Sequence, residues 1–194
     1  MTEPRWKKFT VEEKPAYALA DFLELHAWRF DDEESSDLPA FAERLKEEFY
    51  TALTLCDEKQ LAFVRAAALM SADKKPFVGE MPGEYYAFYF NGFMFLFSWE
   101  DRDYLVLPDE LRGIYDRALA DADFAAKSGR NQELGKYARG LLHLYGAYEI
   151  EWFVEVWNRH HHEKITTEEA EQFLADLEYF DADYYFSEGF IVHE

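Results

Sequence analysis

Two aromatic runs separated by Asn91-Gly92 dominate the middle of the chain. The first run covers residues 85–90 and the second covers residues 93–99, and both are dense in Phe, Tyr and Trp. An Asn-Gly pair between such runs predicts a β-hairpin, because a type I′ turn needs positive φ at both central residues. Residues 104–107 follow a polar turn and extend this prediction to a three-stranded meander. Aromatic residues occupy both odd and even positions of these runs, so in a strand they would point to both faces of the sheet. We therefore expect both faces to be covered; the alternative is that one face is left for a partner.

Helical periodicity is present on both sides of the aromatic runs. Apolar residues recur every three or four positions in residues 19–30, 37–53 and 57–70, and a further helix is expected after Pro108. Near the C-terminus three more helices are predicted, the first of which ends at Gly146 and the last of which begins with a capping box, Thr166 with Glu169. A short hairpin around Glu188-Gly189 is expected to close the chain.

The two halves of the chain therefore share one order of elements, three helices followed by a β-hairpin. Residues 97–106 and 186–192 also echo each other, since Phe-Ser, a turn and an apolar triplet occur in both. We predict an α+β, mainly helical chain made of tandem winged-helix-like modules, residues 1–126 and 131–194, joined at Lys127-Ser128-Gly129-Arg130. A single α+β domain with one three-stranded antiparallel meander is the alternative.

The charge of the chain is strongly acidic and unevenly distributed. The 194 residues include 20 basic and 40 acidic side chains, a net charge of −20, and Lys164 is the last base. Such a charge repels nucleic acid and anionic lipid and attracts basic surfaces, although it can also serve only to keep the protein soluble. The last predicted helix has acids and no base, so no direct nucleic-acid contact is expected at the C-terminal module. The residues expected to contact a basic partner are Glu168, Glu169, Glu171, Asp176, Glu178, Asp181, Asp183 and Glu188.

No pattern of catalytic or metal-binding residues is evident. The run His160-His161-His162 would point its side chains about 100° apart on a helix, which does not favour convergence on one ion. Cys56 lies beside Asp57, which raises the pKa of a thiol and weakens it as a nucleophile. No GxSxG, Walker A or GxGxxG motif is present. We therefore predict that the protein is not an enzyme and that it needs no metal or cofactor.

Cysteine content and hydropathy bear on the cellular location. Cys56 is the single cysteine, so an internal disulfide framework is excluded and a reducing cytoplasm is expected. The longest apolar stretch, Phe93 to Phe97, is far too short to span a bilayer, and no membrane partner is expected.

Residues 104–111, YLVLPDEL, and residues 140–146, GLLHLYG, resemble a pattern in uncharacterised proteins of Gram-positive bacteria and their mobile elements. In that family a Pro-x-Glu helix start precedes a Gly-Leu-Leu helix that ends in Tyr-Gly. The resemblance covers the C-terminal half. It implies no known activity, assigns no catalytic residue and points at most to a phage or mobile-element background.

These observations favour a non-enzymatic protein that binds a basic protein surface. The most specific version of this hypothesis is a nucleic-acid mimic that inhibits a DNA- or RNA-binding enzyme, in the manner of an anti-CRISPR or anti-restriction protein. The alternative is a winged-helix-like regulator or adaptor that forms a homodimer or other protein contacts, or that retains DNA near Lys74 and Lys75. A metal-dependent enzyme that uses the three histidines is a third hypothesis.

Overall fold

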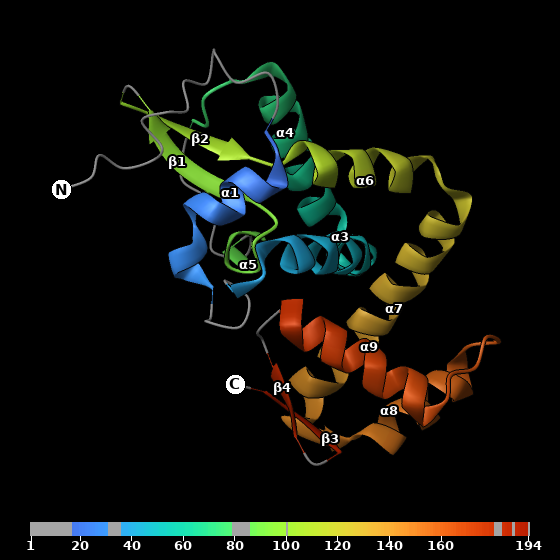
Figure 1. Cartoon of the computed structure of the whole chain (residues 1–194). Coiled ribbons are helices and arrows are strands. Elements are labelled where there is room, and N and C mark those ends of the chain that lie inside the picture. The colour runs from blue at the N-terminus through green and yellow to red at the C-terminus, as the bar shows by residue number, and fades with distance from the viewer. Residues whose placement is uncertain are drawn as a thin grey trace. The chain divides into compact units, whose positions relative to one another are not determined.

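The computed structural model describes residues 17–30, 36–78, 86–99, 101–180, 184–187 and 189–193. Within these residues the protein is α+β and mainly helical, with two small antiparallel sheets (Figure 1), as the sequence predicts. The chain forms two compact units. Unit 1 consists of Met1–Tyr50 with Glu58–Ala120, and unit 2 consists of Thr51–Asp57 with Asp121–Glu194.

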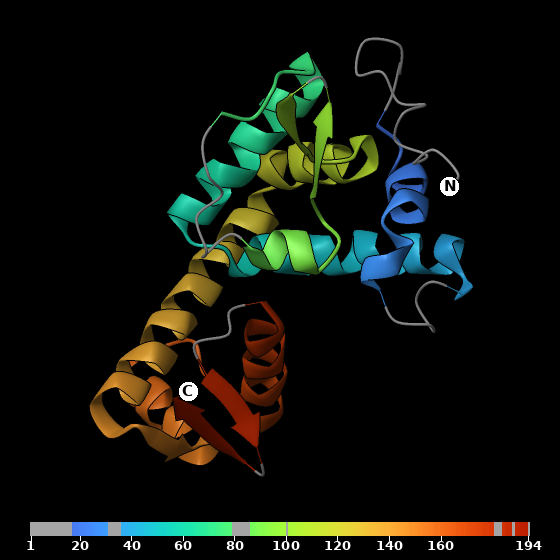
Figure 2. The same ribbon diagram turned by 90° about the vertical axis from the view of Figure 1, so that its left-hand side faces the viewer.

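Unit 1 is a set of helices around a β-hairpin. Strands β1 (Phe95–Trp99) and β2 (Arg102–Val106) pair antiparallel, and Figure 2 shows them between helices α1 and α4. Phe22 of α1 stacks on Phe95 of β1 with ring centroids 5.3 Å apart. On α4, the Ser71 hydroxyl accepts a hydrogen bond of 2.8 Å from the Leu107 amide. The helices of unit 1 are α1 (Leu19–Leu25), the 3-10 helix η2 (Ala27–Arg29), α3 (Leu38–Leu55, whose end belongs to unit 2), α4 (Glu58–Asp73), α5 (Tyr86–Phe90) and α6 (Asp109–Ala120).

The first aromatic run is a helix, α5, and the predicted strand at residues 85–90 is wrong. Gly92 has φ of +78° and ends the helix: its amide donates to the Tyr89 carbonyl, and the Phe93 amide donates to the Phe88 carbonyl. These two bonds form a Schellman motif, in which glycine supplies the left-handed residue after the helix. The positive φ expected for a hairpin turn therefore serves a helix C-terminus instead.

The single three-stranded meander is consequently also wrong. In the described residues the first sheet has only β1 and β2. Phe77, which follows α4, forms an isolated β-bridge with Asp103 of β2. Its amide donates to the Asp103 carbonyl at 2.7 Å. The turn between the strands lies at the predicted polar segment, and Asp101 there has φ of +58°.

Unit 2 has the element order helix, strand, helix, helix, strand, strand. Strand β3 was not predicted; it follows Gly146, which has φ of +73° and ends α7 as expected. The three strands pair antiparallel in the order β3-β5-β4, and Figure 2 shows α9 beside the β4–β5 pair. The elements are α7 (Ala122–Tyr145), β3 (Ala147–Glu149), α8 (Ile150–His160), α9 (Thr167–Phe180), β4 (Tyr184–Ser187) and β5 (Phe190–His193).

The expected linker at residues 127–130 lies inside helix α7. Asp121 caps this helix by accepting from the Asp123 amide, and Phe124, Ser128 and Ala138 belong to its buried face. Burial of that face outweighs the cost of about 1 kcal/mol for a helical glycine at Gly129. The two units instead meet along the chain at residues 120–121, and residues 51–57 join unit 2 as well.

Two buried tyrosines tie the sheet of unit 2 to its helices. The Tyr148 hydroxyl on β3 donates to the Ala138 carbonyl at 3.0 Å, and the Tyr184 hydroxyl on β4 donates to the Leu174 carbonyl at 3.1 Å. Burial raises the pKa of Tyr148, so this hydroxyl stays protonated and remains a donor. Since both rings are nearly fully buried, the two bonds satisfy hydroxyls that would otherwise be costly in the core.

The Schellman assignment predicts opposite effects for two glycine substitutions in unit 1. Gly92→Ala should destabilise the protein by about 1–2 kcal/mol, because a left-handed residue acquires a side chain. The new Cβ would also lie 3.1 Å from Phe30 Cε1. Gly113→Ala is the control, since its Cβ would meet only Arg117 Nη1 at 3.7 Å in a regular helix. The control should be neutral or stabilise by about 0.5–1 kcal/mol. Urea unfolding of both variants measures the difference, and equal midpoints would contradict the assignment.

Candidate functional site

Helix α9 carries the acidic residues that the sequence singles out. Of the eight predicted contact residues, five lie on α9, while Asp181, Asp183 and Glu188 lie outside the described residues. The helix buries Ala170, Leu174 and Leu177 against unit 2. Because the buried positions recur at helical spacing, the carboxylates are confined to the remaining surface of α9.

The acidic side chains of α9 divide between two neighbouring stripes. Glu168, Glu171 and Glu178 fall at i, i+3 and i+10, and the first two are exposed while Glu178 is half-buried. Glu169 and Asp176 fall at i and i+7 on the adjacent stripe, which also contains Phe173. The structure therefore does not bring the five carboxylates together on one face.

The predicted capping box at the start of α9 is confirmed. The Thr166 amide donates to Glu169 Oε2 at 2.9 Å, and the Glu169 amide donates to Thr166 Oγ1 at 3.2 Å. Glu168 benefits from the same helix start: hydrogen bonds from its own backbone amide and from the Thr166 side chain lower its pKa. A carboxylate at a helix N-terminus also interacts favourably with the helix dipole, so the start of α9 favours the charged form of Glu168.

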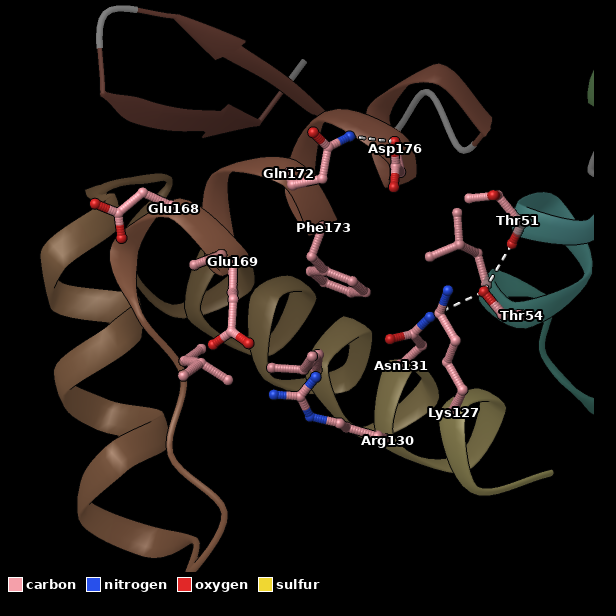
Figure 3. A pocket seen from close by; sticks show the side chains of 14 residues that line it. Thr51, Thr54, Lys127, Arg130, Asn131, Glu168, Glu169, Gln172, Phe173 and Asp176 are labelled. Carbon is pink, nitrogen blue, oxygen red and sulfur yellow. Dashed lines mark hydrogen bonds between the residues drawn. The ribbon is translucent and has the colours of Figure 1, made fainter. Parts of the chain in front are cut away.

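The stripe with Glu169 and Asp176 forms one wall of a pocket of about 390 Å³ within unit 2 (Figure 3). Helix α7 forms a second wall, and the end of α3 forms a third. The lining residues are Thr51, Thr54, Leu55, Lys127, Arg130, Asn131, Leu134, Ile165, Glu168, Glu169, Ala170, Gln172, Phe173 and Asp176. Sequence reasoning missed this pocket, because its walls come from separate stretches of the chain, and the wall from α3 lies more than 70 residues before the wall from α7.

Side-chain hydrogen bonds hold the wall from α3 against α7. Asn131 Nδ2 donates to Thr54 Oγ1 at 3.0 Å, and Gln132 Nε2 donates to the Cys56 carbonyl at 3.0 Å. The Thr54 hydroxyl in turn donates to the Thr51 carbonyl at 2.8 Å. These bonds satisfy the polar groups at the end of α3 and fix that side of the pocket.

The charged walls of the pocket carry opposite signs. Figure 3 shows Lys127 and Arg130 extending from α7, and Glu169 and Asp176 extending from α9, with Phe173 between them. Arg130 Nε lies 2.9 Å from Glu163 Oε1, and Asp176 Oδ1 accepts a hydrogen bond of 2.8 Å from Gln172. Glu163 does not line the pocket, so this ion pair of Arg130 reaches outside it.

The histidine run lies at the end of helix α8, where His161 packs against aromatic rings. Helix α8 ends at His160, and His161 folds back so that its ring stacks on Trp157, with centroids 3.7 Å apart and an interplanar angle of 4°. Tyr137 packs edge-on against His161, and His161 Nδ1 lies 3.9 Å from Glu133 Oε2. Among the described residues no group of three or more His, Cys, Asp or Glu side chains could hold a metal ion.

Cys56 is buried and not poised for chemistry. The side chain is fully buried, and its thiol donates to the Ala52 carbonyl at 3.2 Å. Burial raises the pKa of the thiol, and the nearby charge of Asp57 raises it further, as the sequence suggests. A thiol held protonated in this way is a poor nucleophile and a poor metal ligand.

In the part of the chain that the structure describes, every helix is too short or too polar to cross a lipid bilayer.

The capping box at α9 predicts a pH-dependent loss of stability in Thr166→Ala. The variant should lose about 1 kcal/mol at neutral pH, as expected for an N-cap threonine. Part of the loss comes from Glu168, whose lowered pKa means that its contribution exists above the usual carboxyl range and disappears as pH falls. The difference from wild type should therefore shrink in acid. Thr167→Ala, one position later, is the control and should change little. Denaturant titrations across this pH range measure both variants, and a pH-independent loss would contradict the role of Glu168.

Comparisons with known proteins add no assignment. The chain matches no protein-family model, no curated protein and no solved structure. The resemblance of residues 104–111 and 140–146 to proteins of mobile elements therefore stays a prediction. The functional proposal rests on the side chains described above.

Proposed function

We propose that the protein is a non-enzymatic binding module whose acidic helix α9 engages a basic surface on another protein. The observation that supports this most directly is the composition of α9, which carries five carboxylates and no base in Thr167–Phe180. Three of them, Glu168, Glu169 and Glu171, are exposed to solvent.

The topology of unit 2 supports the proposal that this unit is a winged-helix-like module. The order helix, strand, helix, helix, strand, strand with sheet order β3-β5-β4 agrees with such a module, and α9 then takes the place of the recognition helix. A recognition helix needs Lys, Arg, Asn or Gln to contact phosphates and base edges. With carboxylates there instead, the surface repels DNA and suits a partner that carries the opposite charge.

Unit 1 agrees less well with the proposal of two winged-helix-like modules in tandem. Helices α1, α3 and α4 precede the β1–β2 hairpin, but α5 lies between α4 and the first strand, and α6 follows the second. The proposal therefore depends on unit 2 alone.

A nucleic-acid mimic is the form of this function that best fits the charge of the chain. Carboxylates along α9 would occupy a groove that a nuclease or another nucleic-acid enzyme uses for phosphates. A net charge of −20 would also steer the association and make it sensitive to salt. Such a role fits a protein of the cytoplasm, where the single, unpaired Cys56 would remain reduced.

Charge-neutral variants of α9 test the proposal. The double variant Glu168→Gln, Glu171→Gln should weaken capture of a basic nucleic-acid-binding protein from a host lysate by about tenfold, because rim charges act at long range. The matched control is Glu47→Gln, Glu58→Gln, which changes the net charge equally at exposed positions of unit 1. Capture is compared for the three proteins at low salt and near-molar salt. Capture that is insensitive to salt, or lost equally in both double variants, would overturn the proposal.

A homodimer is a second candidate, favoured by the outer face of the sheet in unit 2. The strand register places Tyr185 beside Val192 on the face opposite Tyr148 and Ile191, and Phe190 lies on the same face as Tyr185. Tyr185 and Phe190 are each 44% exposed, and exposed aromatic side chains of this kind are frequent in interfaces.

Sedimentation velocity distinguishes this second candidate. A dimer of the wild-type chain should dissociate in Phe190→Ser, because the substitution removes an exposed aromatic side chain from the middle strand of this face. Leu144→Ser is the control, since it removes an exposed apolar side chain that lies on α7 instead of the sheet. A wild-type chain that sediments as a monomer at every concentration would eliminate the homodimer.

A further inference from the structure

The pocket in Figure 3 has the properties of a ligand site in its own right. Its volume of about 390 Å³ lies in the range of small-molecule pockets, which combine an apolar lining with a few convergent polar groups. Leu134, Ile165 and Phe173 supply the apolar part, and all three are at least 90% buried. The polar groups come from three separate stretches of the chain.

The distribution of charge restricts what the pocket can hold. Lys127 and Arg130 on α7 face Glu169 and Asp176 on α9 across the pocket. A purely anionic ligand would be attracted to the first wall and repelled by the second, and a purely cationic ligand would meet the reverse. A ligand with both charges can interact favourably with both walls at once.

The opposing side chains are held on their own sides of the pocket. Glu169 Oε2 accepts from the Thr166 amide, and Asp176 Oδ1 accepts from Gln172, its neighbour one turn earlier on α9. Arg130 pairs with Glu163, outside the pocket lining. These contacts preorganise the charges around the pocket, which reduces the entropy that a ligand must lose in ordering them.

We infer that this pocket binds a small zwitterion with an apolar body, the chemistry shared by free amino acids and short peptides. The carboxylate of the ligand faces Lys127 and Arg130, its ammonium group faces Glu169 and Asp176, and its apolar part lies against Phe173. The pocket shares one residue with the exposed stripe that is proposed to contact a protein partner, since Glu168 lines the pocket and Glu171 does not. The inference does not require that partner, because the ligand contacts assigned here involve Lys127, Arg130, Glu169, Phe173 and Asp176.

Titration of the full-length protein with four probes tests the inference. L-leucine and the dipeptide L-alanyl-L-leucine are the zwitterions, and calorimetry should give a dissociation constant on the order of 1 mM or tighter for at least one. N-acetyl-L-leucine and L-leucinamide keep the apolar body but remove one charge each, and each should bind at least about tenfold more weakly. The first two probes distinguish an amino-acid ligand from a peptide ligand.

Matched variants locate the binding in the pocket. Lys127→Gln and Asp176→Asn should each weaken binding of the zwitterion about tenfold, because each removes one charge from one wall. Lys136→Gln on α7 and Glu151→Gln on α8 are the controls, since both side chains are exposed and neither lines the pocket. Unfolding midpoints verify that all four variants fold. No binding of either zwitterion at about 10 mM, a concentration well above the expected constant, would overturn the inference. Equal binding of the charge-blocked probes, or equal losses in pocket and control variants, would overturn it as well.

Discussion

Burial of one face of helix α7 is the interaction on which unit 2 depends. Phe124, Leu134 and Ala138 bury the helix along its length, and the Ala138 carbonyl accepts the hydrogen bond of Tyr148 that positions the first strand. Asn131 and Gln132, on the same helix, hold the end of α3. Without this long helix strand β3 would lose its anchor, and the pocket would lose one wall and the contacts that hold the wall from α3. The buried face explains why Ser128-Gly129, which reads as a loop in isolation, is helical here: tertiary burial exceeds the small unfavourable propensity of one glycine.

The separation of charge within unit 2 follows from the same arrangement. Its six bases lie on α7, on α8 and in the connection that follows α8, whereas α9 carries acids alone. Helix packing turns this order along the chain into opposite walls of a pocket and leaves Glu168 and Glu171 exposed, with Glu168 also lining the pocket. The acidic side chains of α9 therefore lie in two different surroundings. On the exposed stripe they would repel nucleic acid and attract the basic protein that we propose, and at the pocket they face Lys127 and Arg130.

Local sequence signals were reliable where a short segment determines its own conformation. The capping box of Thr166 with Glu169 and the helix end at Gly146 both form as expected, because each depends on hydrogen bonds within a few residues. The Asn91-Gly92 pair shows the limit of such reasoning. Positive φ at Gly92 is compatible with a hairpin turn and with a helix end, and the choice depends on burial of Phe88, which is completely enclosed in unit 1. Aromatic density alone could not distinguish these outcomes, since Phe and Tyr pack in either conformation.

The sequence by itself determined the mainly helical α+β class, the acidic charge of α9 and the weak nucleophilicity expected of Cys56 beside Asp57. These properties follow from periodicity, from composition and from immediate neighbours, all of which are local. Only the tertiary structure decided the helical state of residues 86–90, the position of strand β3, the assignment of residues 51–57 to unit 2 and the existence of the pocket. Each of these depends on contacts between residues distant along the chain, such as Thr54 with Asn131, and no local pattern encodes such a contact.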